Sequence, residues 1–162
     1  MVNNLKTKEK KITYKDVADY FLAFANERGE QLTNLKLQKL VYYAQAWHLA
    51  NFSKPLFKED FQAWVHGPVL PDLYDNYKGH GSSPIVTKLK MKTLENKFNA
   101  KTVEFLDEVA SVYMQHGAYE LELMTHQEDP WIEARGGCEP DEKCKEIISQ
   151  DSMMEYYGQK IK

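Results

Sequence analysis

The chain has 162 residues, of which 43% are hydrophobic and 28% are charged, and its formal net charge is -3. This length allows one hydrophobic core but is short for two, so a single domain is expected. No apolar run approaches the roughly 20 residues that cross a bilayer, and residues 1–11 lack the apolar centre of a signal peptide, which excludes a membrane-spanning protein and predicts a soluble, cytoplasmic one.

The first helix should begin where Thr13 is followed by Asp16, because this pair is typical of a helix start. Apolar residues then recur with a period of about 3.6, at Val17, Ala18, Phe21, Leu22 and Ala25. Gly29 should end this helix, and Asp19 and Asn26 should face the solvent.

A second helix can be capped by Thr33 or Asn34 and should run to about Asn51. Apolar residues along it recur at steps of three and four, and they are Leu37, Leu40, Val41, Ala44 and Trp47. The opposite face is not fully polar either, because it carries Tyr42, Tyr43 and Leu49. A helix that is apolar on most sides belongs at the centre of a domain. His48 on this helix is expected to be a hydrogen-bonded core residue rather than a metal ligand.

The next segment, Phe61–Val65, has the pattern of a strand and leads into a turn at Gly67 and Pro68. Pro71 is well placed in the first turn of a third helix that runs through Tyr77. Two prolines this close restrict the backbone, because each fixes its own φ and biases the preceding residue toward extended geometry.

Three large side chains, Trp64, His66 and Tyr74, project from this stiff corner, which we define as residues 64–74. Such an arrangement suits either a recognition surface or a tight junction between packed elements. The sequence leaves both interpretations open.

Charge is segregated in the following part of the chain. Residues 86–101 contain five lysines against Glu95, whereas residues 102–142 contain eleven acidic residues against Arg135. The lysine run lacks interleaved arginine and contains a single aromatic residue, Phe98, so a solvated face is favoured over a nucleic-acid surface. A nucleic-acid surface would use Lys88, Lys90, Lys92, Lys97 and Lys101 and would lose affinity steeply with salt. The acidic part would suit a basic protein partner.

Asn99 can cap a long helix that Gly117 interrupts and that should pack on the central helix. A shorter helix over residues 119–124 precedes Asp129 and Pro130, which can start another helix. The segment around Ile147 and Ile148 could be a second short strand, and a last helix can start at Ser149. Together these elements predict a mainly α fold: a single compact helical domain over residues 13–162 with a small two-stranded β element, preceded by a flexible tail of residues 1–12.

One alternative for function is a metal-assisted or acid–base hydrolase in which His66, His126 and Glu128 converge. The spacing of two between His126 and Glu128 would place them on different sides of one helix, so help from another element would be required. The favoured interpretation is that Thr125, Glu128 and Asp129 bond free backbone donors between two helices.

Other chemistry has little support in the sequence. The chain contains no Gly-x-Ser-x-Gly turn and no glycine-rich phosphate loop, so no cofactor is expected. Cys138 and Cys144 are six positions apart in a polar stretch, without the Cys-x-x-Cys pairs of a zinc site. We therefore expect two reduced thiols and no metal.

Three segments resemble the signatures of the Panacea antitoxin domain family, whose members are also described as phage-associated proteins. Leu35–Trp47 looks like the first signature. Phe61–Val69, with Pro71 and Tyr74 after it, is similar to the Ala-Trp-x-x-Gly-Pro-Val turn of that family, and Leu123–Arg135 resembles its Thr-His-x-x-x-Pro-Trp segment. The three segments span most of the chain.

The resemblance implies a helical, non-enzymatic antitoxin that neutralises a cognate toxin by direct binding, in a prophage or a toxin–antitoxin system. A second possibility that it implies is a proteolytic adaptor that delivers the toxin to a protease. A membrane is not expected as a partner. The residues expected to bind the partner or to form the motif are Trp64, His66, Gly67, Pro68, Pro71, Tyr74, His126 and Trp131.

Overall fold

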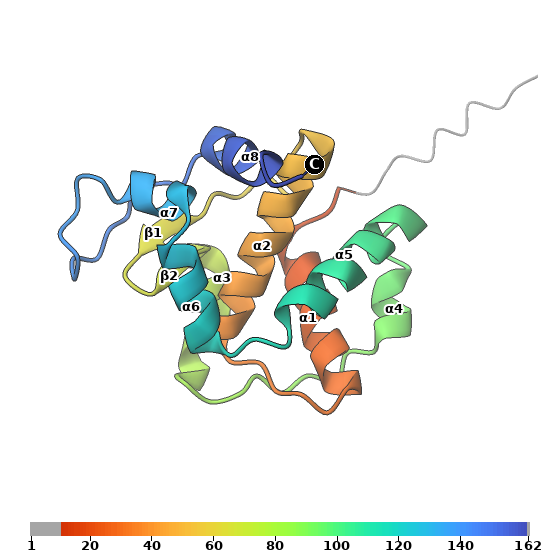
Figure 1. Cartoon of the computed structure of the whole chain (residues 1–162). Helices are drawn as coiled ribbons and strands as arrows, with labels where there is room; N and C mark the ends of the chain where they lie inside the picture. The colour runs from red at the N-terminus through yellow and green to blue at the C-terminus, as the bar shows by residue number, and fades with distance from the viewer. Residues whose placement is uncertain (1–10, 162) are drawn as a thin grey trace, which may run out of the picture.

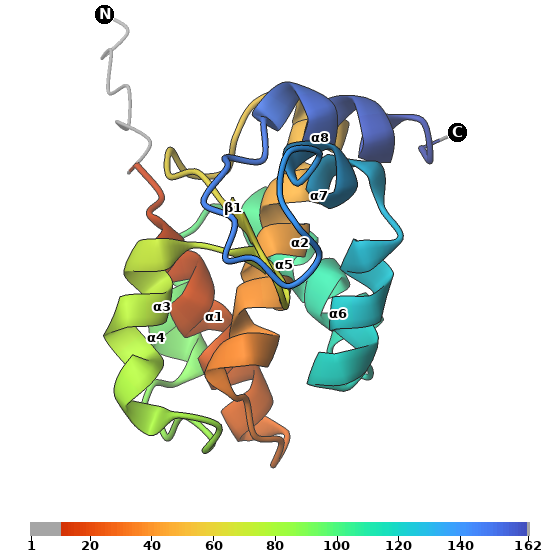
Figure 2. The same cartoon turned by 90° about the vertical axis from the view of Figure 1, so that its left-hand side faces the viewer.

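Helix α2 (Asn34–Phe52) runs through the middle of the molecule, and the other elements surround it (Figure 1, Figure 2). The structure is a computed structural model that describes residues 11–161. The predicted flexible tail, residues 1–12, therefore lies almost entirely outside the described residues. The central position predicted for α2 is confirmed, because every residue from 37 to 46 is buried.

The elements around α2 are mostly helices. In chain order they are α1 (Tyr14–Glu27), β1 (Gln62–Trp64), β2 (Gly67–Val69), α3 (Pro71–Tyr77), the 3₁₀ helix η1 (Lys78–His80), α4 (Met91–Glu95), α5 (Ala100–Tyr113), α6 (Ala118–His126), α7 (Asp129–Ala134) and α8 (Gln150–Gly158). The predicted fold class, a mainly helical domain with a small two-stranded sheet, is confirmed. None of the helices in residues 11–161 is long and apolar enough to cross a membrane.

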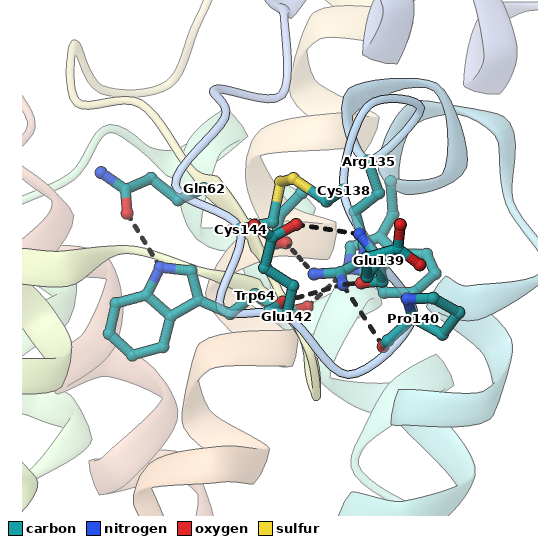
Figure 3. The surroundings of a disulfide bond; sticks show 10 residues. Gln62, Trp64, Arg135, Cys138, Glu139, Pro140, Glu142 and Cys144 are labelled. Atoms are coloured by element: carbon teal, nitrogen blue, oxygen red, sulfur yellow. Dashed lines mark hydrogen bonds between the residues drawn. A yellow bond between two sulfur atoms is a disulfide. The ribbon is translucent and has the colours of Figure 1, made fainter.

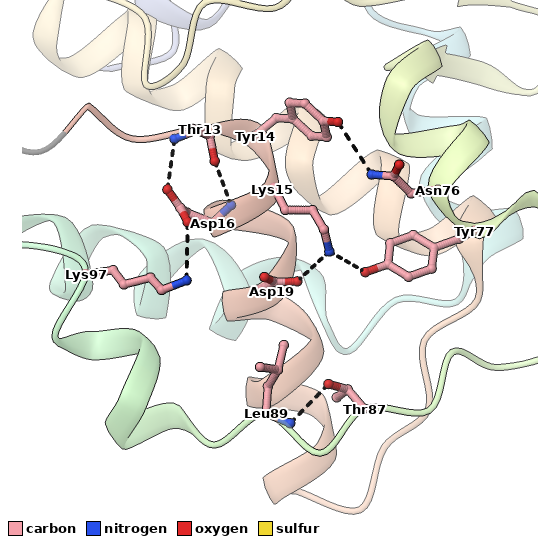
Figure 4. Close-up of polar contacts among 10 residues, drawn as sticks. All are labelled: Thr13, Tyr14, Lys15, Asp16, Asp19, Asn76, Tyr77, Thr87, Leu89 and Lys97. Carbon is pink, nitrogen blue, oxygen red and sulfur yellow. Dashed lines mark hydrogen bonds and ion pairs between the residues drawn. The ribbon is translucent and has the colours of Figure 1, made fainter.

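Local capping signals place several helix starts where the sequence predicts them. Thr13 and Asp16 form a reciprocal capping box, with each side chain accepting the backbone N–H of the other at 3.2 and 3.1 Å (Figure 4). Thr33 caps α2, Asn99 caps α5 and Ser149 caps α8, in each case by accepting a backbone N–H three residues later. A side-chain cap satisfies a donor that the first helical turn leaves free.

The first helix differs from its prediction on one face. Asp19 is only 9% exposed rather than facing the solvent. Lys15 on the same helix donates its ammonium to the Asp19 carboxylate at 3.1 Å and to the Tyr77 hydroxyl at 3.0 Å, which connects this part of α1 to the end of α3 (Figure 4). Asn26 is exposed, as predicted.

The two strands of the sheet are closer together in the sequence than predicted. β1 pairs antiparallel with β2, in the register Gln62 with Val69, Ala63 with Pro68 and Trp64 with Gly67. The segment at Ile147 and Ile148, which we expected to be the second strand, makes one isolated bridge to β1 on its other edge. The prediction of its partner was wrong because the short turn at 65–66 lets β2 fold straight back onto β1.

His48 is a buried core residue, as the sequence predicts. Its Nδ1 lies 2.7 Å from the carbonyl oxygen of Lys54, and its ring contacts those of Phe52 and Phe105.

Candidate functional site

The central helix carries polar side chains that are buried against the chain at residues 56–70. Gln38, Lys39 and Gln45 are each no more than 1% exposed. The Gln45 side chain accepts the backbone N–H of Leu56 at 2.7 Å and donates to the carbonyl oxygen of Phe57 at 2.7 Å. These bonds satisfy backbone groups of a segment that has little regular structure of its own.

The side chains of Gln38 and Lys39 bond backbone groups of β2 and of the residue that follows it in the same way. Gln38 Oε1 accepts the backbone N–H of Leu70 at 2.9 Å. Lys39 Nζ donates to the carbonyl oxygen of Pro68 at 3.2 Å. The apolar pattern of α2 did not predict a role for these three residues, although polar residues within an otherwise apolar helix are a signal that the sequence contains.

At Gly67 the backbone of the corner lies directly against side chains of α2 and α6. Its φ is +105°, and a Cβ atom placed on it would lie 2.6 Å from Lys39 Cε and 2.8 Å from Thr125 Oγ1. A side chain would therefore clash with two buried neighbours in a backbone conformation that already favours glycine. Gly67 and Pro68 are buried, which makes them part of a junction and not of a free surface.

Lys39 is a fully buried amine beneath this junction. Burial lowers its pKa from 10.5 to about 7, an effect that the carboxylate of Glu122 on α6 partly opposes. Glu122 in turn lies 3.0 Å from Nδ1 of His66, which stands exposed at the turn between the strands. The corner is thus joined to α6 by a short series of charged and polar groups.

The outer side of the corner carries an aromatic pair. The rings of Trp64 and Tyr74 meet edge to face with their centroids 5.0 Å apart, and the ammonium of Lys143 lies 4.7 Å from the Trp64 ring. Trp64 also donates through Nε1 to the Gln62 side chain at 2.8 Å (Figure 3). Tyr74 is 36% exposed, while Pro71 at the start of α3 is half-buried. The structure therefore combines a buried junction with an accessible aromatic surface.

The predicted motif residues of α6 and α7 lie behind β1. Trp131 Nε1 donates to the carbonyl oxygen of Trp64 at 2.9 Å, and the His126 ring stacks on the Trp131 ring at 4.0 Å. Burial lowers the pKa of His126, while the Glu122 carboxylate and the Val65 carbonyl oppose that shift. His126 and Trp131 thus brace the corner from behind and are less accessible than His66.

Arg135 extends this bracing to the loop after α7, and it is only 6% exposed. Its Nη1 donates to the carbonyl oxygen of Ala63 at 2.8 Å, and its Nη2 donates to the carbonyl oxygens of Glu139 and Glu142 at 2.7 and 2.9 Å (Figure 3). The loop therefore curls around one guanidinium group, which has several donors arranged in a plane.

Cys138 and Cys144 form a disulfide bond in this loop (Figure 3). The prediction of two reduced thiols was wrong. The spacing alone gave no indication of the curl around Arg135, which brings the two Cα atoms to 6.0 Å, a separation that a disulfide can bridge.

Glu128 occupies the N-cap position of α7, but its side chain does not bond a free backbone donor there as predicted. Its carboxylate accepts the hydroxyl groups of Tyr43 and Tyr157 at 2.7 and 2.8 Å, and burial raises its pKa. Thr125 instead donates to the carbonyl oxygen of Glu122 at 2.8 Å, and Asp129 is the first residue of α7 rather than its cap. The capping interpretation was wrong because α8 brings Tyr157 against α2 and creates a deeper site for the Glu128 carboxylate.

The three residues proposed for a hydrolase do not share one contact, although the Glu122 carboxylate acts on both histidines. His66 lies against Glu122, His126 stacks on Trp131, and Glu128 lies between tyrosines. Within residues 11–161, no group of three His, Cys, Asp or Glu side chains is arranged to hold a metal ion. The hydrolase alternative requires convergence of these side chains, and their contacts do not provide it.

Comparison with known proteins relates the chain to antitoxins. The family described as "Antitoxin SocA-like, Panacea domain" matches residues 37–132, which include the buried face of α2, the corner and Trp131. The protein described as "Antitoxin SocA" from Caulobacter vibrioides (strain NA1000 / CB15N) is 33% identical over 78 residues. That match covers 48% of this chain and 42% of the relative, so it spans less than half of the length of that antitoxin. No solved structure matches the chain.

Proposed function

The chain belongs to the family described as Antitoxin SocA-like, Panacea domain, and from this membership we propose that it neutralises a cognate toxin protein by binding it directly. The family relationship indicates a non-enzymatic role. The mechanism that we propose is occlusion, in which the bound antitoxin covers a surface that the toxin needs for its activity. We further propose that the folded domain acts in the cytoplasm, as the sequence predicts.

The observation that carries this proposal is the construction of the corner. Beneath it, Lys39, Gly67 and Pro68 form a close-packed junction, and Trp131 bonds it from behind. On its outer side, the aromatic pair consists of an exposed Tyr74 and a half-buried Trp64. Large aromatic side chains on a rigid support are favourable anchors for a protein partner, because little conformational entropy is lost on binding.

Charge supports a basic partner. His66 at the turn lies beside Glu122, and α7 carries exposed carboxylates at Asp129 and Glu133. Acidic residues around an aromatic anchor attract a basic protein during encounter and disfavour acidic ones. We therefore propose that the toxin presents a basic surface to this side of the molecule.

Co-expression tests the proposal. The protein encoded by the neighbouring reading frame would be produced alone and together with this chain, with growth and copurification as readouts. We expect the neighbouring protein to inhibit growth, and this chain to restore growth and form a complex. A neighbouring protein that is harmless, or that inhibits growth without being neutralised, would contradict the proposal.

Single substitutions then test the corner. Tyr74→Ala should weaken the complex at least about tenfold, because an aromatic anchor is lost. Tyr119→Ala is the matched control, since Tyr119 is 69% exposed and lies at the opposite end of α6 from Thr125, which contacts the corner. Equal affinities for both variants and the parent chain, measured by titration calorimetry, would make the corner a structural junction only.

A further inference from the structure

A second candidate surface is an open groove between the C-terminal half of α2, the outer face of α5 and the end of the described chain. Its volume is about 460 Å³. The apolar residues that line it are Trp47, Phe52, Phe105, Val109, Val112 and Ile161. None of them belongs to the corner, so the groove is a separate feature of the molecule.

The floor of the groove is rigid. Trp47 Nε1 donates to the hydroxyl group of Tyr113 at 2.6 Å, and the Tyr113 ring stacks on the Tyr43 ring at 4.0 Å, nearly parallel. Tyr43 is itself bonded to the half-buried Glu128. The aromatic floor is therefore fixed before any partner arrives, which lowers the entropy cost of binding.

The walls of the groove remain open to solvent. Val112 is 48% exposed and Ile161 is 43% exposed. Apolar side chains at the edge of a rigid aromatic floor gain most when another apolar side chain covers them. The groove thus has the features of an anchor site for a polypeptide and lacks the enclosure of a small-molecule cavity.

Two carboxylates on the rim indicate the charge of the occupant. Glu104 and Glu108 line the groove, are exposed, and stand four residues apart on α5. Within residues 11–161 neither of them forms an ion pair. Like charges at this spacing repel each other on a helix, so a cation placed between them would be stabilising.

The groove also holds a cation of its own. The ammonium of Lys101 lies 5.0 Å from the centre of the ring of Phe52, which also lines the groove, in a cation–π arrangement. Lys101 is the one basic residue among those that line the groove in the described part of the chain. Two carboxylates against one ammonium leave the rim with net negative charge.

We propose that this groove is a second contact surface for the toxin, and that it receives an apolar segment flanked by lysine or arginine. The inference rests on the proposed function for the identity of the partner. Apolar side chains of the segment would cover Trp47 and Val112, and its cations would lie between Glu104 and Glu108. An amphipathic helix laid in a groove is a common form of such recognition.

Two kinds of variant test the proposal with the co-expressed toxin. One reverses the charge of the groove rim, and the other introduces a charge at an apolar position of the groove. Glu104→Lys with Glu108→Lys, and separately Val112→Asp, should each weaken binding at least about tenfold. The matched controls are Asp107→Lys, on the same helix but outside the groove, and Val86→Asp, at a valine that is 86% exposed. Both controls should change the affinity less than about twofold.

A peptide titration tests, without the toxin, whether the groove binds a basic amphipathic helix. The probe is a synthetic amphipathic helix of about 15 residues with leucines on one face and flanking lysines, together with a twin in which glutamate replaces each lysine. With the full chain labelled with ¹⁵N, the lysine peptide should shift the indole signal of Trp47 and leave that of Trp131 in place. Val112→Asp should weaken this binding at least about tenfold.

The outcomes separate the two proposals. If the toxin binds the parent chain and the groove variants with equal affinity, the groove is not a contact surface for the toxin, and the proposed function is unaffected. If the chain binds no toxin at all, the proposed function fails. The peptide titration then shows whether the groove binds an apolar segment flanked by lysines. A lysine peptide that leaves the Trp47 signal unchanged, or a glutamate twin that binds equally well, overturns the inference.

Discussion

At the scale of single residues, Gly67 is the glycine at which an added Cβ atom meets its neighbours most closely. We predict that Gly67→Ala lowers the free energy of unfolding by about 3 kcal/mol, since overpacking adds to the cost of a positive φ. Gly29→Ala is the control, because Gly29 also has a positive φ of +69° but nothing lies within 4 Å of the added Cβ. That variant should lose about 1 kcal/mol. Chemical denaturation of both variants would measure the difference, and equal losses would contradict the clash at Gly67.

The buried Lys39 gives the stability of the fold a specific pH dependence. Its pKa is about 7 in the folded chain and 10.5 when exposed. Between these values the unfolded chain holds one more proton than the folded chain, so stability rises with pH across this window. The cost of the buried charge is fully present below pH 7, and the slope above it approaches about 1.4 kcal/mol per pH unit.

Lys39→Met tests this dependence, because methionine has a similar length and does not titrate. We expect the free energy of unfolding of the parent chain to increase between about pH 7 and pH 9, and that of the variant to stay nearly level. Only the slope is decisive, since the variant also leaves the Pro68 carbonyl without its lysine donor. A variant that keeps the slope of the parent chain would show that another group titrates.

The sequence predicted the motif residues as one group and did not separate those that are buried from those that are accessible. Gly67, Pro68 and Trp131 were predicted together with His66 and Tyr74, yet the first three form or brace a junction and the last two face outward. Burial of this kind depends on which other element packs there, as with Glu128. Its tyrosine partners come from residues 43 and 157, and no local pattern could bring them together.

At the scale of elements, the loop after α7 is held in two ways, by Arg135 and by the disulfide bond. Replacing Cys138 and Cys144 by serine should lower the free energy of unfolding by at most about 2 kcal/mol, because the closed loop is short. Thermal denaturation with and without a reducing agent would measure this effect in the parent chain. The double serine variant is the control, and its melting temperature should not respond to the reductant.

Element boundaries were predicted well where the signal is local. The cap residues Thr13, Thr33, Asn99 and Ser149 set their helices because a cap depends on atoms only a few residues away. The pairing of the strands and of the cysteines depends on how the chain returns in space. Both of those predictions were wrong for that reason.

At the scale of the whole molecule, the asymmetry of charge should govern how fast a complex forms. If the proposed toxin is basic, raising the ionic strength from about 0.05 M to 0.5 M should slow association about tenfold or more, since screening weakens long-range attraction. The dissociation rate should change much less. Stopped-flow measurements on the purified pair would show this, and an association rate independent of salt would contradict electrostatic steering by the acidic segment at residues 102–142.

The fold class could be predicted because apolar periodicity is a property of each helix by itself. The continuous apolar character of α2 was enough to place it at the centre, as found. The groove could not be predicted, since it is formed by Trp47, Val112 and Ile161 from three distant parts of the chain. A surface of this kind becomes visible only once the packing of the helices is known.

The strands of the corner have no edge to offer to another chain. β1 is paired with β2 on one side and bonded to residues 146 and 148 on the other, while α2 side chains occupy the Pro68 carbonyl and the Leu70 N–H. A binding partner therefore cannot extend this sheet by adding a strand, and must be selected by side chains alone. Such a scaffold could exchange one partner for another through surface substitutions while its backbone stays unchanged.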